Sequence, residues 1–265
     1  MRIARRDAFT LTELLVVIAV IGILATLLLT AISEARVKAR AAQCGNNLRQ
    51  LGVALQEFVQ DHAAYPLVNG TNYPYAEVHD PQQWFDDLQW GYLSSTGNAS
   101  VFEGAWRCPS YYEDFGFSYG YNAYGLFSIE AVRQPTGTES LGLGGHTTFG
   151  TGRIGTGVSL AEPPVRESEV ANPADMMAIG DSFVGGNDVI GDGSHVLGRT
   201  FFSARDGVDA ASTKRCYARH SGGANVVFCD GHVESPKLYF LFEATGDDAL
   251  SRWHRDHLPH RERLQ

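Results

Sequence analysis

The stretch Phe9–Ile32, FTLTELLVVIAVIGILATLLLTAI, decides how the rest of the chain is organised. It consists almost entirely of leucine, isoleucine, valine and alanine, and a helix that spans a membrane needs about 20 such residues. Glu13 does not fit this composition, because a carboxylate deep in a bilayer costs roughly 3 kcal/mol and therefore requires a partner. The preceding segment, MRIARRDA, is short and basic.

Two simple interpretations leave the acid unexplained. A cleaved secretory signal usually has a shorter apolar core without an acid. A plain membrane anchor accounts for the length and the basic residues, but not for the position of Glu13. Cleavage between Ala8 and Phe9 would give the mature chain a free ammonium group one helical turn before Glu13. The Glu13 carboxylate of one subunit can then neutralise the Phe9 amine of the next subunit in a staggered stack.

This arrangement resembles the class III signal of type IV prepilins and type II secretion pseudopilins. The residues that carry the resemblance are Arg5, Arg6, Ala8, Phe9, Thr10, Leu11, Thr12, Glu13 and Leu14. The resemblance implies cleavage before Phe9, N-methylation of Phe9 by a prepilin peptidase, and assembly through Glu13. The chain has Ala8 where this family usually has glycine.

The same resemblance implies a function. The chain would be a structural subunit, and not an enzyme, that polymerises into a type IV pilus or a type II secretion-like filament. Its partners would be other copies of itself, related pilins, the prepilin peptidase, an inner-membrane assembly platform and membrane lipid. It would cross the bacterial inner membrane once, with its head in the periplasm or on an extracellular filament. The alternative is a membrane-anchored periplasmic binding or adhesive protein that does not polymerise.

Composition is consistent with an exported protein. The chain has 265 residues and a formal net charge of −9, which argues against a nucleic-acid partner. Its four cysteines are an even number, as expected for disulfides in an oxidising compartment.

A second helical pattern follows the apolar stretch. From residue 33 no proline occurs until Pro66, and apolar or small residues recur in steps of three and four at Val37, Ala41, Cys44, Leu48, Leu51, Leu55 and Phe58. The spacing predicts one helix from Phe9 to about His62, whose second half is the spine of a globular head.

We therefore expect an α+β, pilin-like fold, in which a long N-terminal helix packs on a small antiparallel sheet with long loops. The expected segments are a leader (1–8), a transmembrane and assembly helix (9–32), an amphipathic spine helix (33–62), an α+β head (63–250) and a basic, flexible tail (251–265).

The segment Arg215–Ser235 predicts a three-stranded antiparallel meander. Asp230-Gly231 separates two β-prone runs, which is typical of a hairpin with a type I′ turn. A turn at 221–224 before the same central strand would place Cys216 opposite Cys229, which predicts a disulfide between them.

Cys44 lies on the apolar face of the spine helix, where Cys108 could reach it. We predict a Cys44–Cys108 disulfide that ties the helix to the head. Because spacing alone does not give connectivity, two buried free thiols remain the alternative.

His220 and Asp230-Gly231 are similar to the H-x9-DG motif of a family of prepilin-type proteins. Further segments that resemble this family are 46–52, 108–110 and 178–182, together with Asp61, Tyr65 and Pro66. The motif can be structural, with Asp230-Gly231 forming the turn and His220 bonding across the hairpin, or it can have a separate function. We favour the structural interpretation.

Three other patterns suggest chemistry. Segments 180–183 (GDSF) and 192–195 (DGSH) resemble esterase blocks, but they are too close together to converge from a scaffold. No cofactor is expected, with one exception: Asp181, Asn187, Asp188 and Asp192 could bind calcium, which prefers oxygen ligands, or could be turn residues.

The third pattern is histidine-rich. His254, His257 and His260 could suggest a transition metal, but Pro259 interrupts any helix there. We therefore expect a solvated basic tail that carries Arg252, Arg255, Arg261 and Arg263.

Overall fold

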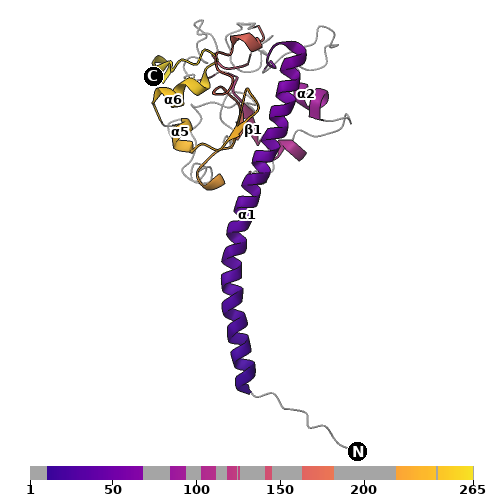
Figure 1. The fold of residues 1–265 in the computed structure, drawn as a ribbon, viewed down its shortest axis with the longest axis vertical. Helices are drawn as coiled ribbons and strands as arrows, with labels where there is room; N and C mark the ends of the chain where they lie inside the picture. The colour runs from indigo at the N-terminus through magenta and orange to yellow at the C-terminus, as the bar shows by residue number, and fades with distance from the viewer. Residues whose placement is uncertain are drawn as a thin grey trace, which may run out of the picture. The chain divides into compact units, whose positions relative to one another are not determined.

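The structure is a computed structural model (Figure 1) that describes residues 11–67, 84–93, 103–111, 118–123, 125, 141–144, 163–181, 219–242 and 244–264. The chain divides into two compact units, Met1–Arg40 and Ala41–Gln265. Helix α1, Leu11–His62, begins in the first unit and ends in the second. The expected α+β, pilin-like fold with a long N-terminal helix is confirmed.

In the first unit, α1 presents apolar side chains on all sides. Every residue from Leu11 to Arg40 is exposed. The large apolar side chains between Leu11 and Ile32 have exposed fractions of 39% to 79%. By length and composition, α1 is the one helix in the described part of the chain that could cross a membrane. Lipid or neighbouring chains are needed to cover such a surface.

In the second unit, α1 has the predicted apolar face from Cys44 onward. The residues of this face are at most 1% exposed: Cys44, Leu48, Leu51, Leu55 and Phe58. Val37, which the pattern placed on the same face, is 46% exposed and belongs to the first unit. The part of α1 that packs into the head is therefore shorter than residues 33–62.

The head contains a four-stranded antiparallel sheet in the order β1-β2-β3-β4. The strands are β1 (Tyr119–Tyr121), β2 (Met177–Asp181), β3 (Val226–Phe228) and β4 (Val233–Glu234). The pairs Gly120 with Gly180, Gly180 with Val226, and Val226 with Glu234 define the register, and β2 has an irregularity between Met177 and Ile179.

Both faces of the sheet are covered. Along β3, Val227 packs in a core cluster with α1 residues such as Leu48, whereas Val226 and Phe228 pack in a second cluster with Leu238 and Trp253. This alternation follows from the two-residue period of a strand. Burial on both faces explains why the sequence around β2 and β3 is continuously apolar.

Short helices complete the head. Helix α2 (Trp84–Leu88) continues into a π-helical turn, Gln89–Leu93. The ring of Trp84 is fully buried and stacks on Tyr121 with centroids 5.1 Å apart, so Trp84 is a core residue. The other short helices are Gly104–Trp106, Glu167–Glu169, Arg219–Ser221, α5 (Leu238–Phe242), α6 (Asp247–Leu250), Ser251–Trp253 and Arg261–Leu264.

The prediction of a solvated, flexible tail is wrong. Trp253 is fully buried and His254 is 1% exposed. The backbone of Arg255 donates to Leu141 O (2.8 Å) and accepts from Ala171 N (2.7 Å). The basic side chains hid this burial from the sequence, because short 3₁₀ turns leave no apolar periodicity to detect.

Helix α1 and the β3–β4 hairpin are in close contact at Gly52. A Cβ atom added to Gly52 would lie 2.6 Å from Val227 Cγ2 and 3.5 Å from Gly231 O. The contact with Gly231 O is an ordinary one, but the clash with Val227 cannot be relieved easily, because Val227 is fully buried. The sheet can therefore approach α1 this closely only where the helix carries no side chain.

We predict opposite effects for two helical glycines. Gly52→Ala should lower the free energy of unfolding by roughly 1–3 kcal/mol, because the new methyl group overpacks the helix–hairpin contact. Gly45→Ala is the matched control: nothing lies within 4 Å of its added Cβ, so the gain in helix propensity, about 1 kcal/mol, should dominate. Denaturant unfolding of the full chain in detergent, followed by tryptophan fluorescence, measures both. Equal effects would contradict the close contact.

Candidate functional site

The predicted hairpin at Asp230-Gly231 is confirmed, but its turn differs from the type I′ turn that the sequence suggested. Phe228 N donates to His232 O (3.0 Å) and Gly231 N donates to Phe228 O (2.9 Å). The loop therefore has three residues and ends in Gly231, whose φ is +86°. A type I′ turn needs positive φ at two adjacent central residues, and Asp230 does not have it.

The predicted third strand before residue 221 is not the neighbour of β3. That neighbour is β2, with Met177 opposite Phe228. Residues 219–221 instead form a 3₁₀ turn in which φ is +46° at His220 and +58° at Ser221. A distant strand thus takes the place that the local pattern had assigned to residues 215–220.

The Cys216–Cys229 disulfide prediction fails for the same reason. Cys229 N donates to Met176 O (3.0 Å), so the chain beside Cys229 is the one that leads into β2. Cys229 is a free, buried cysteine, and Cys216 lies outside the described residues. Burial raises the pKa of the Cys229 thiol to about 12, so it stays protonated and unreactive at neutral pH.

The buried carboxylate of Asp181, at the end of β2, is the centre of a polar cluster. Oδ1 accepts a hydrogen bond from Arg219 Nη2 (3.0 Å), and Oδ2 accepts one from Asn225 N (2.7 Å). His220 Nε2 lies 3.2 Å from Oδ2. Because a carboxylate only accepts, we place a proton on Nε2. The side chains of Arg219 and His220 are each 3% exposed, so the ion pair is shielded from water.

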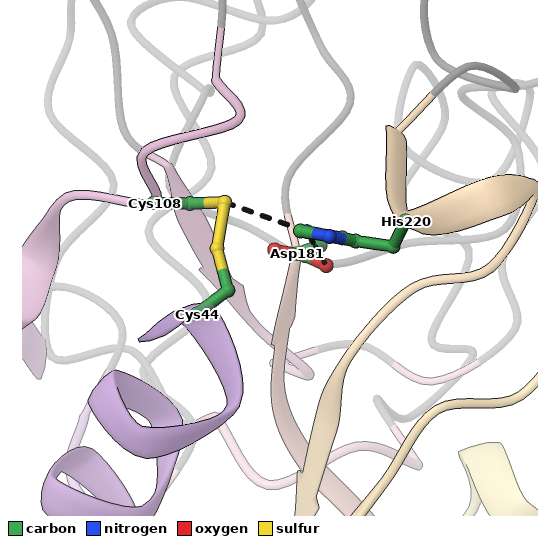
Figure 2. Close-up of side chains that lie close together, drawn as sticks. All are labelled: Cys44, Cys108, Asp181 and His220. Carbon is green, nitrogen blue, oxygen red and sulfur yellow. Dashed lines mark hydrogen bonds and ion pairs between the residues drawn. A yellow bond between two sulfur atoms is a disulfide. The ribbon is translucent and has the colours of Figure 1, made fainter. Parts of the chain in front are cut away.

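Figure 2 shows the imidazole of His220 pointing toward both Asp181 and the Cys44–Cys108 disulfide. This disulfide is the predicted one, with Cα atoms 5.0 Å apart. His220 Nε2 lies 3.4 Å from Cys108 Sγ. The bridge closes a loop across a sequence separation of 64 residues. In the chain-entropy model such a link stabilises the folded state by about 4 kcal/mol.

The other end of the H-x9-DG motif also contacts α1. A Cβ atom at Gly231 would lie 2.8 Å from Gln56 Oε1, and its positive φ is unfavourable for other residues. Asp230 Oδ1 accepts from His232 N (3.0 Å) and so holds the turn. Both residues of the DG pair are therefore required by the fold.

The motif thus attaches the hairpin to α1 at two places. His220 contacts the disulfide of Cys44, and Gly231 contacts Gln56, roughly 18 Å further along the helix at 1.5 Å per residue. The His220 end is almost fully buried, with a side chain 3% exposed, which supports the structural interpretation of the motif.

Sequence reasoning missed two residues of this region. Arg219 pairs with Asp181, and its guanidinium carbon also lies 5.3 Å from the centre of the Tyr111 ring. Asn122 is fully buried and donates to Met177 O (2.9 Å) and Trp253 O (3.1 Å). The only sequence signal for Arg219 was its position next to His220. No sequence pattern indicated Asn122.

The remaining predicted residues are spread along the chain. Glu13 lies in the first turn of α1, and Ala8 and Phe9 lie outside the described residues. Asn187, Asp188 and Asp192, three of the four predicted calcium ligands, are also outside them, as are Ser182 and His195 of the esterase-like segments. Calcium stays a prediction, although Arg219 and Asn225 already bind both oxygens of Asp181.

Comparison with family models gives two matches. Residues 3–29 match the prokaryotic N-terminal methylation motif. Residues 33–195, more than half of the chain, match the model described as protein of unknown function (DUF1559). The chain belongs to the DUF1559 family. A search of curated proteins and a search of solved structures found no match.

The two matches together make this DUF1559 protein a type IV prepilin-like chain. The methylation motif covers the basic start and most of the apolar stretch, and the DUF1559 match begins just after residue 32. That boundary coincides with the end of the apolar sequence. One apolar N-terminal helix and a prepilin-type motif fit a single-pass, membrane-anchored protein.

We predict that Asp181→Asn lowers the free energy of unfolding by about 3–5 kcal/mol, because it leaves the buried Arg219 cation without its counter-charge. Asp247→Asn is the control. It removes the partner of Arg261 on the surface, where both side chains are more than half exposed, and should cost at most about 1 kcal/mol. Denaturant unfolding measures both.

A double variant tests the reason for this loss. Arg219→Met in the Asp181→Asn background removes both charges and should recover part of the lost stability. Equal stability of Asp181→Asn and Asp247→Asn would show that the buried pair is not what holds β2 to the 219–225 turn.

Proposed function

We propose that this chain is a structural subunit of a type IV pilus or a type II secretion-like filament, and that it polymerises through residues 9–32 after removal of residues 1–8. One observation carries the proposal: a prepilin-type motif at residues 3–29 continues into a helix whose apolar side chains are exposed on all sides. In a filament, the helices of neighbouring subunits cover these side chains.

Polar groups in this part of α1 support helix–helix or helix–lipid packing. The hydroxyls of Thr26 and Thr30 donate to Ile23 O (2.7 Å) and Leu27 O (2.8 Å) of their own helix. They therefore do not need water, and the outer surface of the helix stays apolar.

Glu13 is the exception to this apolar surface. Two buried charges that pair are tolerated together, whereas removal of one leaves the other unpaired in an apolar medium. The proposed partner of the Glu13 carboxylate is the Phe9 ammonium group of the neighbouring subunit. This pairing sets the axial stagger between subunits and gives the acid a function that a plain anchor lacks.

The location of the head follows from charge and redox chemistry. Arg2, Arg5 and Arg6 precede the apolar stretch, so this end stays in the cytoplasm and the head crosses the membrane. The Cys44–Cys108 disulfide supports an oxidising compartment such as the periplasm. The proposed partners are the prepilin peptidase, the inner-membrane assembly platform, membrane lipid, other copies of the chain and related pilins.

We predict that Glu13→Gln abolishes or strongly reduces filament formation while the amount of membrane-inserted protein stays normal, because the intersubunit ion pair is lost and the apolar stretch is unchanged. Glu13→Val should insert at least as well and should also fail to assemble. Glu34→Gln is the control: this exposed acid lies in α1 beyond the apolar stretch, and the variant should assemble normally.

The measurement compares membrane-fraction protein with sheared or crosslinked polymer, in a strain that builds the filament. If both Glu13 variants polymerise as the wild type does, Glu13 does not set the register. If the wild type inserts without polymerising, the chain is instead a membrane-anchored periplasmic protein.

A further inference from the structure

The C-terminal segment after Trp253 forms a compact loop with histidines at both ends. Hydrogen bonds from Arg255 to the 141–142 segment hold its start: Arg255 N donates to Leu141 O (2.8 Å) and Nη1 donates to Gly142 O (3.0 Å). Positive φ angles at His257 (+58°) and His260 (+40°) turn the chain back on itself. The loop therefore brings His260 next to His254, with ring centroids 4.7 Å apart.

Three side chains of this loop converge on one point. Each of His254, Asp256 and His260 offers one atom to a group in which all atoms lie within 4.8 Å of one another. His260 Nε2 lies 2.7 Å from Asp256 Oδ2. His257, which the sequence pattern grouped with the other two histidines, instead faces Asp175: its Nε2 atom lies 3.7 Å from Asp175 Oδ2.

The other polar atom of each of these side chains is held by a hydrogen bond. His254 Nδ1 donates to Leu258 O (2.8 Å), and His260 Nδ1 donates to a carboxylate oxygen of Glu262 (2.8 Å). Asp256 Oδ1 accepts from Leu258 N (3.1 Å). These bonds occupy Nδ1 of both rings and Oδ1 of Asp256, and so leave Nε2 of each ring and Oδ2 of Asp256 as the atoms that can bind an ion. Outer-shell bonds of this kind, from imidazole to a carbonyl or carboxylate, are typical of metal-binding histidines.

Burial also fixes the ring of His254. A Cβ atom at Gly125 would lie 2.8 Å from its Cδ2 atom, so the backbone packs directly against the ring edge. His254 is 1% exposed, so its imidazole is held in place by the surrounding core. Asp256 and His260 are more open, with side chains 35% and 20% exposed, and leave a route for an ion.

We propose that His254 Nε2, Asp256 Oδ2 and His260 Nε2 bind a zinc ion. Two imidazoles and one carboxylate suit zinc, whereas calcium prefers an all-oxygen set. On binding, the ion takes the place of the proton between His260 and Asp256, and that proton goes to solvent. Three protein ligands leave a fourth tetrahedral position for water or a group from a neighbouring molecule. The ion would hold the two ends of the C-terminal loop together.

The test uses the full chain in detergent, stripped with a chelator and titrated with zinc against a chromophoric competitor. The wild type should bind one equivalent, and cobalt substitution should give the visible absorption of a four-coordinate site. Asp256→Asn and His260→Gln should each weaken binding by about tenfold or more. His257→Gln, a neighbouring histidine outside the cluster, should bind as the wild type does.

Thermal unfolding without metal checks that each variant is folded, and Asp256→Asn keeps the test valid if His260→Gln does not fold. Zinc should raise the melting temperature of the wild type and of His257→Gln only. The proposal is wrong if the wild type binds no stoichiometric zinc. It is equally wrong if both cluster variants retain their equivalent, since the ion then binds elsewhere, for example at the surface group of Asp230, His232 and Glu234.

Discussion

The close contact between α1 and the β3–β4 hairpin is the constraint on which the head depends. Gly52 has no side chain, so Val227 and the Gly231 backbone can lie directly against the helix. That contact positions β3, and β3 positions β2 through their shared register. Asp181 then lies at the end of β2 beside the 219–225 turn, where it binds Arg219 and the backbone of Asn225. The Cys44–Cys108 bridge fixes the same arrangement covalently, two helical turns away from Gly52.

This chain of contacts gives a physical reason for the H-x9-DG motif. The histidine contacts both a buried carboxylate and a disulfide through Nε2, and the glycine is needed both for its positive φ and for its contact with Gln56. The motif therefore joins a hairpin to the helix that also carries the apolar N-terminal stretch. Because of this joint, the head cannot separate from the buried part of α1 without unfolding the core of the sheet.

Some of this structure could be predicted from the sequence because the signals are local. The three- and four-residue spacing from Cys44 to Phe58 gave the buried face of α1, and hence the correct partner for Cys108. Asp230-Gly231 gave the hairpin.

The partner of β3 could not be predicted in the same way, since β2 lies some 45 residues earlier and a closer β-prone segment competed for the position. That error also produced the wrong pairing for Cys229. The burial of the C-terminal segment was not predicted, because its 3₁₀ turns have no apolar periodicity. The Arg219–Asp181 pair was not predicted either, because the sequence does not report which charges are buried.

Non-reducing peptide mapping of protein purified from native membranes, combined with the intact mass, tests most directly whether this is a processed prepilin-type chain with a covalently anchored head. Thiols are alkylated before and after unfolding. We expect a mature chain that begins at a methylated Phe9, a Cys44–Cys108 link, and a Cys229 thiol that is alkylated only after unfolding. A mature terminus elsewhere, an uncut chain in cells with active peptidase, or a Cys229 bonded to Cys216 would contradict this description.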